Sequence, residues 1–189
     1  MALIQSQRAL AALYTDAAAR VRLRDDPLAF AAEFALDAPG LAQLQALGEG
    51  RLLAYVGSLE RKRTAEAVRL LPLSARARGP ALRRAFVAYA RRVPLGGGPD
   101  RYLRDVLAFA ERAAHDAGDA PHLRELLDYE ATWLRASSAA AFARVRYYSF
   151  PIARFAGEVA VGRTAERFAR RPTIAVWFVV AGWRAGFTF

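Results

Sequence analysis

The sequence predicts an α+β fold, in which an all-helical N-terminal domain at residues 1–138 precedes a small antiparallel β-sheet module at residues 139–189. Two observations support this prediction. Through the first part of the chain, apolar residues recur at helical spacing between proline and glycine stop signals. The last part instead concentrates β-branched and aromatic residues, which favour strands.

The helical domain is predicted to begin with three helices. Apolar residues at near-helical spacing over 3–21 indicate the first. The next two start at Asp26-Pro27 and at Asp37-Ala38-Pro39, because an aspartate N-cap followed by a proline in the first turn is a helix start signal. Gly48-Glu49-Gly50 ends the third.

Four longer helices are predicted to follow, at 51–71, 80–93, 101–116 and 121–136. The first two are amphipathic, and each carries a basic polar face. The segment 74–79 is expected to be a short link between them, and 96–100, with three glycines in a row, is expected to be a loop.

The sheet module is predicted from two segments. Residues 144–150 alternate as a half-buried strand, and the stretch PTIAVWFVVAGWRAGFTF at 172–189 indicates two strands around Ala181-Gly182. This stretch is no membrane anchor, because Arg171 and Arg184 bracket fewer than the roughly 20 apolar residues that a spanning helix needs. Residues 151–171 are ambiguous, with a short helix around 164–170 as one interpretation.

The residue content argues against an active site in this chain. The 189 residues include no cysteine, which excludes disulfides, thiolate nucleophiles and cysteine-based metal sites. His115 and His122 lack the spacing of metal ligands on a helix. Gly96-Gly97-Gly98 has neither the Lys-Ser/Thr of a P-loop nor a preceding strand. We therefore expect no independent enzyme, no catalytic residue and no metal site. The N-terminus lacks the pattern of a secretion signal, so we expect a cytoplasmic protein.

A formal charge of +10 raises the question of nucleic acid. Arginine supplies nearly all of the basic residues and Lys62 is the one lysine, a bias typical of GC-rich coding sequence. The positive excess lies in 51–92 and 144–189. A DNA-binding regulator that uses the basic helices at 61–92 is therefore the alternative function. Its turn at 71–73 lacks glycine and its second helix lacks Asn or Gln for adenine, so nucleic acid is the less expected partner.

Three stretches of the chain resemble a known family. They are RKRTAEAVRLLPLSARARG at 61–79 with Leu82, Phe86 and Tyr89 after it, YLRDVLAF at 102–109 and HLRELLDYEATW at 122–133. They are similar to the partner subunits of multinuclear non-haem iron oxidases that modify ribosomally made peptides, as in methanobactin production. The resemblance covers 3–133 and extends loosely to 144–151 and 171–172; its most specific parts are LLPLS and EATW.

The resemblance implies a non-catalytic subunit that binds a precursor peptide, usually by its leader, and presents it to the iron oxidase. Iron is then expected in that partner enzyme and no cofactor in this chain. Because a small sheet has edge strands, the leader is expected to add to one of them. The residues assigned to peptide binding are Arg144, Arg146, Tyr147, Tyr148, Trp177 and Trp183, with Arg170, Arg171 and Arg184 as further steering charges. For each aromatic residue of this set, the alternative to peptide contact is packing in the core.

The contact with the oxidase is expected to bury some 1,200–2,000 Å² in total. The residues assigned to this interface are Arg61, Arg63 and Arg69, on the polar face of the helix at 51–71. The sheet is the other surface that could supply it, and the sequence does not choose between them.

Overall fold

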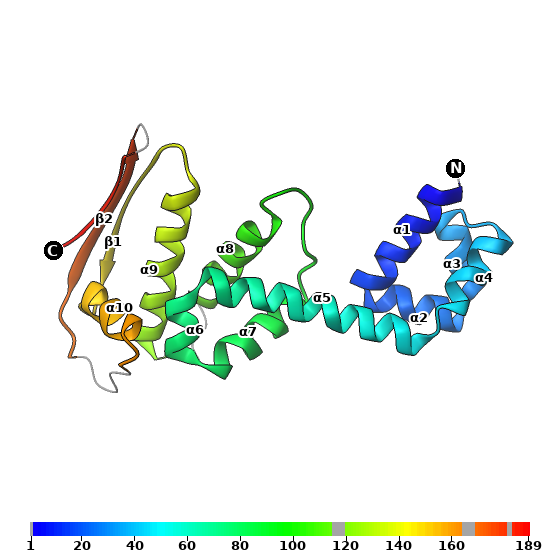
Figure 1. Cartoon of the computed structure of the whole chain (residues 1–189), viewed down its shortest axis with the longest axis horizontal. Coiled ribbons are helices and arrows are strands. Elements are labelled where there is room, and N and C mark those ends of the chain that lie inside the picture. Colours follow the sequence, from blue (N-terminus) through cyan, green and yellow to red (C-terminus); the bar gives the residue numbers. More distant parts are fainter. Residues whose placement is uncertain (1, 115–119, 164–168, 181–182) are drawn as a thin grey trace. The chain divides into compact units, whose positions relative to one another are not determined.

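The α+β prediction is confirmed by the computed structural model, which describes residues 2–114, 120–163, 169–180 and 183–189 (Figure 1). Helices come first, and a three-stranded antiparallel sheet lies at the C-terminal end. The chain divides into two compact units, residues 1–62 and 63–189. Each unit is described by itself below.

The first unit is built from short helices around an apolar core that includes Leu13, Phe30 and Leu44. Its elements are α1 (Ala2–Thr15), α2 (Ala17–Asp25), α3 (Pro27–Phe34), α4 (Ala38–Ala46) and the first part of α5 (Glu49–Leu70). The single helix predicted over 3–21 is wrong, because Asp16 interrupts it. The Asp16 carboxylate accepts a hydrogen bond from the Ala18 amide at 2.8 Å and so caps a new helix.

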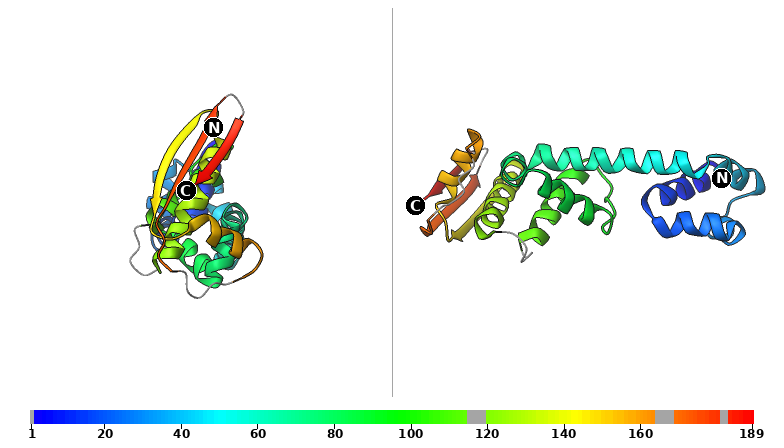
Figure 2. Two further views of the ribbon diagram at one scale, coloured as in Figure 1. Left: turned by 90° about the vertical axis from the view of Figure 1, so that its left-hand side faces the viewer. Right: turned by 90° about the horizontal axis from the view of Figure 1, so that it is seen from below.

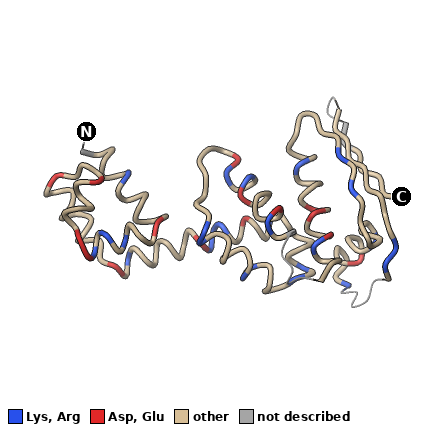
Figure 3. Tube along the Cα trace, turned by 180° about the vertical axis from the view of Figure 1, so that it is seen from behind, with Lys and Arg blue, Asp and Glu red and all other residues tan. Residues whose placement is uncertain are grey.

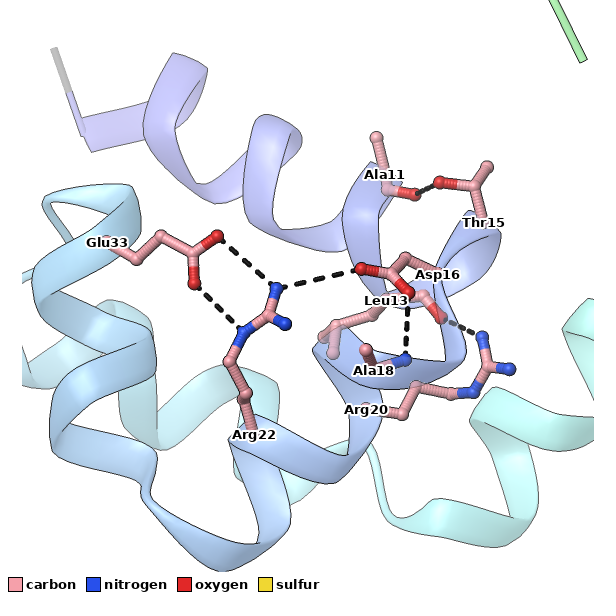
Figure 4. A network of polar contacts seen from close by, with 8 residues as sticks. All are labelled: Ala11, Leu13, Thr15, Asp16, Ala18, Arg20, Arg22 and Glu33. Carbon is pink, nitrogen blue, oxygen red and sulfur yellow. Dashed lines mark hydrogen bonds and ion pairs between the residues drawn. The ribbon is translucent and has the colours of Figure 1, made fainter. Parts of the chain in front are cut away.

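Polar contacts of α2 join the first three helices (Figure 4). Arg22 lies between the carboxylates of Asp16 and Glu33, at 3.6 and 3.1 Å. Arg20 donates to the carbonyl of Leu13 at 2.7 Å, which satisfies the end of α1. Exposed ion pairs contribute about 0–1 kcal/mol each, so burial of the apolar core stabilises this unit more than the network does.

The helices of the second unit are the rest of α5, then α6 (Pro72–Arg78), α7 (Pro80–Ala90), α8 (Arg101–Ala114), α9 (Pro121–Ser138) and α10 (Ile152–Ala160). The link predicted at 74–79 is wrong, since α6 occupies most of it. The helix is capped from a distance: both carboxylate oxygens of Glu130 accept backbone amides at its start, those of Leu73 at 2.6 Å and Ser74 at 2.8 Å. No neighbour in sequence supplies this cap, so local patterning missed the helix.

The sheet has the order β1 (Phe142–Tyr148), β2 (Thr173–Val180) and β3 (Trp183–Thr188), with both pairs antiparallel. Three strands were expected, and β1 begins two residues before the predicted start. The helix that precedes β2 is α10 at Ile152–Ala160, which buries Ile152, Phe155 and Val159. The short helix considered at 164–170 falls largely on residues 164–168, outside the described part of the chain.

Helix α9 lies between the sheet and helices α5, α7 and α8 (Figure 1). Leu127 and Ala131 belong to the core shared with α5, α7 and α8, whereas Leu126 and Ala136 belong to the core under the sheet. The sheet is thus part of the same compact unit as α6 to α10. The division of the chain falls near residue 62, whereas the sequence placed it at 138.

We expect Gly186→Ala to destabilise the second unit by about 1–3 kcal/mol. A Cβ at this position of β3 would lie 2.5 Å from the ring of Trp133 on α9, so the helix and the sheet would have to move apart. Urea unfolding followed by tryptophan fluorescence measures this, since Trp133, Trp177 and Trp183 all belong to the second unit.

Gly157→Ala is the matched control. A Cβ there meets nothing within 4 Å, and alanine is favoured over glycine inside a helix such as α10. Equal losses of stability in the two variants would contradict the packing of Trp133 against β3.

Candidate functional site

The outer edge of β1 has unpaired backbone groups. Ile174 and Phe189 exchange both of their backbone hydrogen bonds, at 3.1 and 2.9 Å. Because hydrogen-bonding direction alternates along a strand, Ala175, Trp177 and Val179 must bond to β1 instead. In the unbroken register of β1 and β2, their partners are Arg146, Arg144 and Phe142.

The amide and carbonyl groups of Ala143, Val145 and Tyr147 therefore point away from β2. In the described part of the chain they form no hydrogen bond, and β1 and β3 are the two margins of the sheet (Figure 2, left). The helix after β1 does not take up this edge, because α10 packs on α9 and α6. An extended peptide can add to such an edge as a further strand.

The outward face of the sheet is apolar. Val145 and Tyr147 are 65% and 67% exposed, and Phe187 and Phe189 stack with their ring centroids 6.4 Å apart. No described position on this face is charged. Its larger side chains are Val145, Tyr147, Ile174, Val176, Phe178, Val180, Phe187 and Phe189.

Two carboxylates of α9 hold the inward face of β1. Asp128 accepts hydrogen bonds from the Tyr148 hydroxyl at 2.8 Å and from Arg146 at 3.2 Å. Glu125 accepts the amides of Ser149 and Phe150 just after the strand, at 2.8 and 3.2 Å. Burial and the neighbouring Asp128 carboxylate raise the pKa of Tyr148, so its hydroxyl stays protonated and remains a donor. These contacts fix which face of β1 points to the helix.

The inward face of β1 also carries excess positive charge. Arg144 is half-buried and, within the described residues, makes no hydrogen bond or ion pair. Burial and the nearby guanidinium groups of Arg146 and Arg135 lower its pKa, with Asp128 as the compensating carboxylate. The Nε of Arg146 is buried and has no hydrogen-bond partner in the same described part. Basic positions on β1 and α9 can be followed in Figure 3.

The residues assigned to peptide binding fall into three groups. Tyr147, Arg144 and Arg146 lie on β1, with Tyr147 on the outward face and the two arginines on the inward face. Trp177 and Tyr148 are only 1% and 2% exposed. Their assignment as anchors is corrected, because both rings pack in the core beneath the sheet. The side chain of Trp183 lies outside the described part.

Sequence reasoning missed Ala143 and Val145, whose backbone groups form the edge. It also missed Glu125 and Asp128, the carboxylates of α9 that accept hydrogen bonds from β1 and the residues just after it. The alternation Arg144-Val145-Arg146-Tyr147 was the available signal for two chemically different faces. It did not reveal which face would be covered, since that depends on α9, whose Asp128 accepts hydrogen bonds from Arg146 and Tyr148.

The residues assigned to the oxidase interface are not equally accessible. Arg63 is corrected to a core residue: it is 8% exposed and forms a two-point ion pair with Asp105, at 2.5 and 2.6 Å. It also donates to the carbonyl of Ala90 at 2.9 Å. Arg69 is exposed and pairs with Glu66 at 2.7 Å, and Arg61 is exposed.

Two further features are absent from the described residues. No group of three or more histidine and acidic residues is placed to hold a metal ion. No helix among these residues is long and apolar enough to cross a bilayer.

Comparison with known proteins gives a match over part of the chain. A family model described as SCO6045-like, C-terminal domain, matches residues 45–115, which include α5 to α8 and none of the sheet. The description names no activity or ligand. No protein of curated function and no solved structure matches the chain.

We expect Asp105→Asn to destabilise the second unit by about 3–5 kcal/mol, because it leaves the buried Arg63 guanidinium without its counter-charge. Glu66→Gln removes the partner of the exposed Arg69 and should cost about 0–1 kcal/mol. Urea unfolding of the two variants measures the difference. Similar small losses of unfolding free energy in both variants would contradict the burial of Arg63 and favour a surface position for it.

Proposed function

We propose that this chain is a non-catalytic, substrate-recruiting subunit that binds a precursor peptide and presents it to an iron-dependent oxidase. The observation that carries the proposal is the unpaired edge of β1 between an apolar face and a basic face. An edge of this kind recognises an extended segment through its backbone, and the two faces supply selectivity through side chains.

The edge offers three amides and three carbonyls, from Ala143, Val145 and Tyr147. A net gain of about 0.5–1.5 kcal/mol for each hydrogen bond gives several kcal/mol at most, before the cost of ordering the peptide is subtracted. Backbone pairing alone is therefore weak, so affinity and selectivity depend on the side chains beside the edge.

The enzyme partner of the proposal comes from the resemblance to oxidase partner subunits. Of the three arginines assigned to this contact, Arg63 is buried, Arg69 is paired with Glu66, and Arg61 alone is exposed without a described ion pair. We therefore place the contact at the outward face of the sheet. A strand added to β1 would continue this face, so an enzyme seated there would contact the chain and the bound peptide together. From strand spacings the face measures roughly 350 Å², less than half of the roughly 800 Å² that each partner of a stable complex buries. The peptide and a further surface would supply the rest.

The alternative, DNA binding by the basic helices at 61–92, is less well supported. Three of the arginines there already serve the fold: Arg63 pairs with Asp105, Arg69 pairs with Glu66, and Arg76 donates to the carbonyls of Val159 and Ala160 at 3.1 and 2.6 Å. The segment keeps a positive excess, but its turn at 71–73 lacks glycine and its second helix lacks Asn or Gln for adenine.

We expect Val145→Pro to abolish peptide binding without unfolding the sheet. The Val145 amide points to the free edge, so proline there removes a donor to the added strand and no bond to β2. Binding is measured by panning a display library of random nine-residue peptides on the wild-type chain. The affinity of the enriched peptides for each variant then follows from fluorescence anisotropy.

Thr188→Pro is the matched control at the opposite margin. Thr188 is opposite Ala175, whose backbone groups bond to β1, so the Thr188 amide points to the outer edge of β3. The proposal predicts full binding by this variant. If Thr188→Pro loses binding and Val145→Pro keeps it, the site on β1 is wrong, and if neither variant changes binding, strand addition is wrong.

A further inference from the structure

We infer that the edge of β1 selects a peptide segment in which acidic residues alternate with apolar ones. This inference rests on the proposed function, and it specifies the chemical class of the peptide. It follows from what lies on each side of β1 at the position where an added strand would run.

On the inward side, the added strand would meet arginines. Side chains at directly opposite positions of neighbouring strands lie about 5 Å apart, so every second residue of the peptide would be beside Arg144 or Arg146. Arg144 has no hydrogen-bond or ion-pair partner in the described residues, and the Nε of Arg146 is a buried donor without an acceptor. A carboxylate at these positions would give Arg144 an ion-pair partner and the Nε of Arg146 a hydrogen-bond acceptor.

The acids already present on the inward side do not meet this need. Asp128 is shared by Arg146 and the Tyr148 hydroxyl. Arg135, the third cation of the cluster, pairs only loosely with the exposed Glu111, at 3.7 Å. A lysine or arginine in the peptide would instead add a fourth positive charge beside three others. The inward positions therefore favour aspartate or glutamate and disfavour basic residues.

On the outward side, the intervening residues of the peptide would lie beside Val145 and Tyr147. Both side chains are exposed, and no charged side chain is described on that face. An apolar residue would bury surface there, whereas a charged one would be desolvated without a partner. Acidic and apolar preferences thus fall on successive residues of one strand.

At its described positions, the opposite margin of the sheet does not show this pattern. The described inward positions of β3 are Gly186 and Thr188, which are uncharged, and Trp133 fills the space beside Gly186. The selectivity is therefore assigned to the edge of β1.

Three synthetic peptides test the inference. Each is nine residues long, carries fluorescein and alternates valine with glutamate, glutamine or lysine; binding to the full chain is followed by anisotropy. We expect the glutamate peptide to bind roughly tenfold more tightly than the glutamine peptide, the effect of one or two charge-assisted hydrogen bonds, and the lysine peptide to bind most weakly.

Arg144→Gln identifies the residue responsible. It removes a charge that takes part in no described hydrogen bond or ion pair, so the fold should persist, which far-ultraviolet circular dichroism checks. The ratio of glutamate to glutamine affinity should fall several-fold in this variant. Arg84→Gln, an equal change of charge at an exposed position of α7, should leave the ratio at its wild-type value.

The outcomes separate the inference from the proposed function. Equal affinities for the three peptides, all lost in Val145→Pro, would overturn the selectivity and leave strand addition standing. An equal fall of the ratio in Arg144→Gln and Arg84→Gln would also overturn it, since attraction to the overall charge of +10 would then be the cause. A preference for glutamate that Val145→Pro leaves intact would overturn both proposals. Absence of binding by all three peptides would overturn the selectivity, while the random library would still test strand addition.

Discussion

The second unit depends on the packing of α9 on two sides at once. One side of the helix contributes Leu127 and Ala131 to a helical core, and the other contributes Leu126 and Ala136 to the core beneath the sheet. Its carboxylates serve both sides as well. Glu130 caps α6, while Glu125 and Asp128 hold β1. The position and facing of the sheet therefore follow from one helix.

Among the described residues of the second unit, this arrangement covers one face of the sheet only. Antiparallel sheets often have one solvated face, which is then polar, but here the free face is apolar. Exposed apolar surface of this kind is typical of an interaction site. The free edge of β1 borders the same face, so an added peptide would extend it. This continuity is why we assign the peptide and its enzyme to neighbouring surfaces.

The fold could be predicted from the sequence where the signals are local. The prolines and aspartates at Asp26 and Asp37 correctly mark helix starts, and the β-branched run at 173–180 correctly marks a strand. Features that depend on distant contacts were missed. Helix α6 needs Glu130, from beyond two intervening helices, and the burial of Arg63 needs Asp105.

In the candidate site, too, features with a local sequence signal could be predicted and features that depend on distant contacts could not. The alternating sequence of β1 correctly separated Val145 and Tyr147 from Arg146 and Tyr148 as two faces of the strand. Tyr147 is exposed, as a residue that contacts a ligand must be. Trp177 and Tyr148 could not be assigned from sequence, because an aromatic residue in a strand suits a core and an interface equally well. The side that α9 covers decided between the two, and no residue near them in sequence indicates that side.

Purification of the tagged chain from its own host, at moderate salt, tests the central claim most directly. Bound iron and the identity of the co-eluting molecules would be measured together. The account predicts an iron-containing oxidase and a short peptide in the complex, with the iron remaining on the oxidase when high salt separates the two proteins. An iron-free chain that carries nucleic acid, released steeply by salt, would contradict it and favour the basic helices at 61–92 as the functional surface.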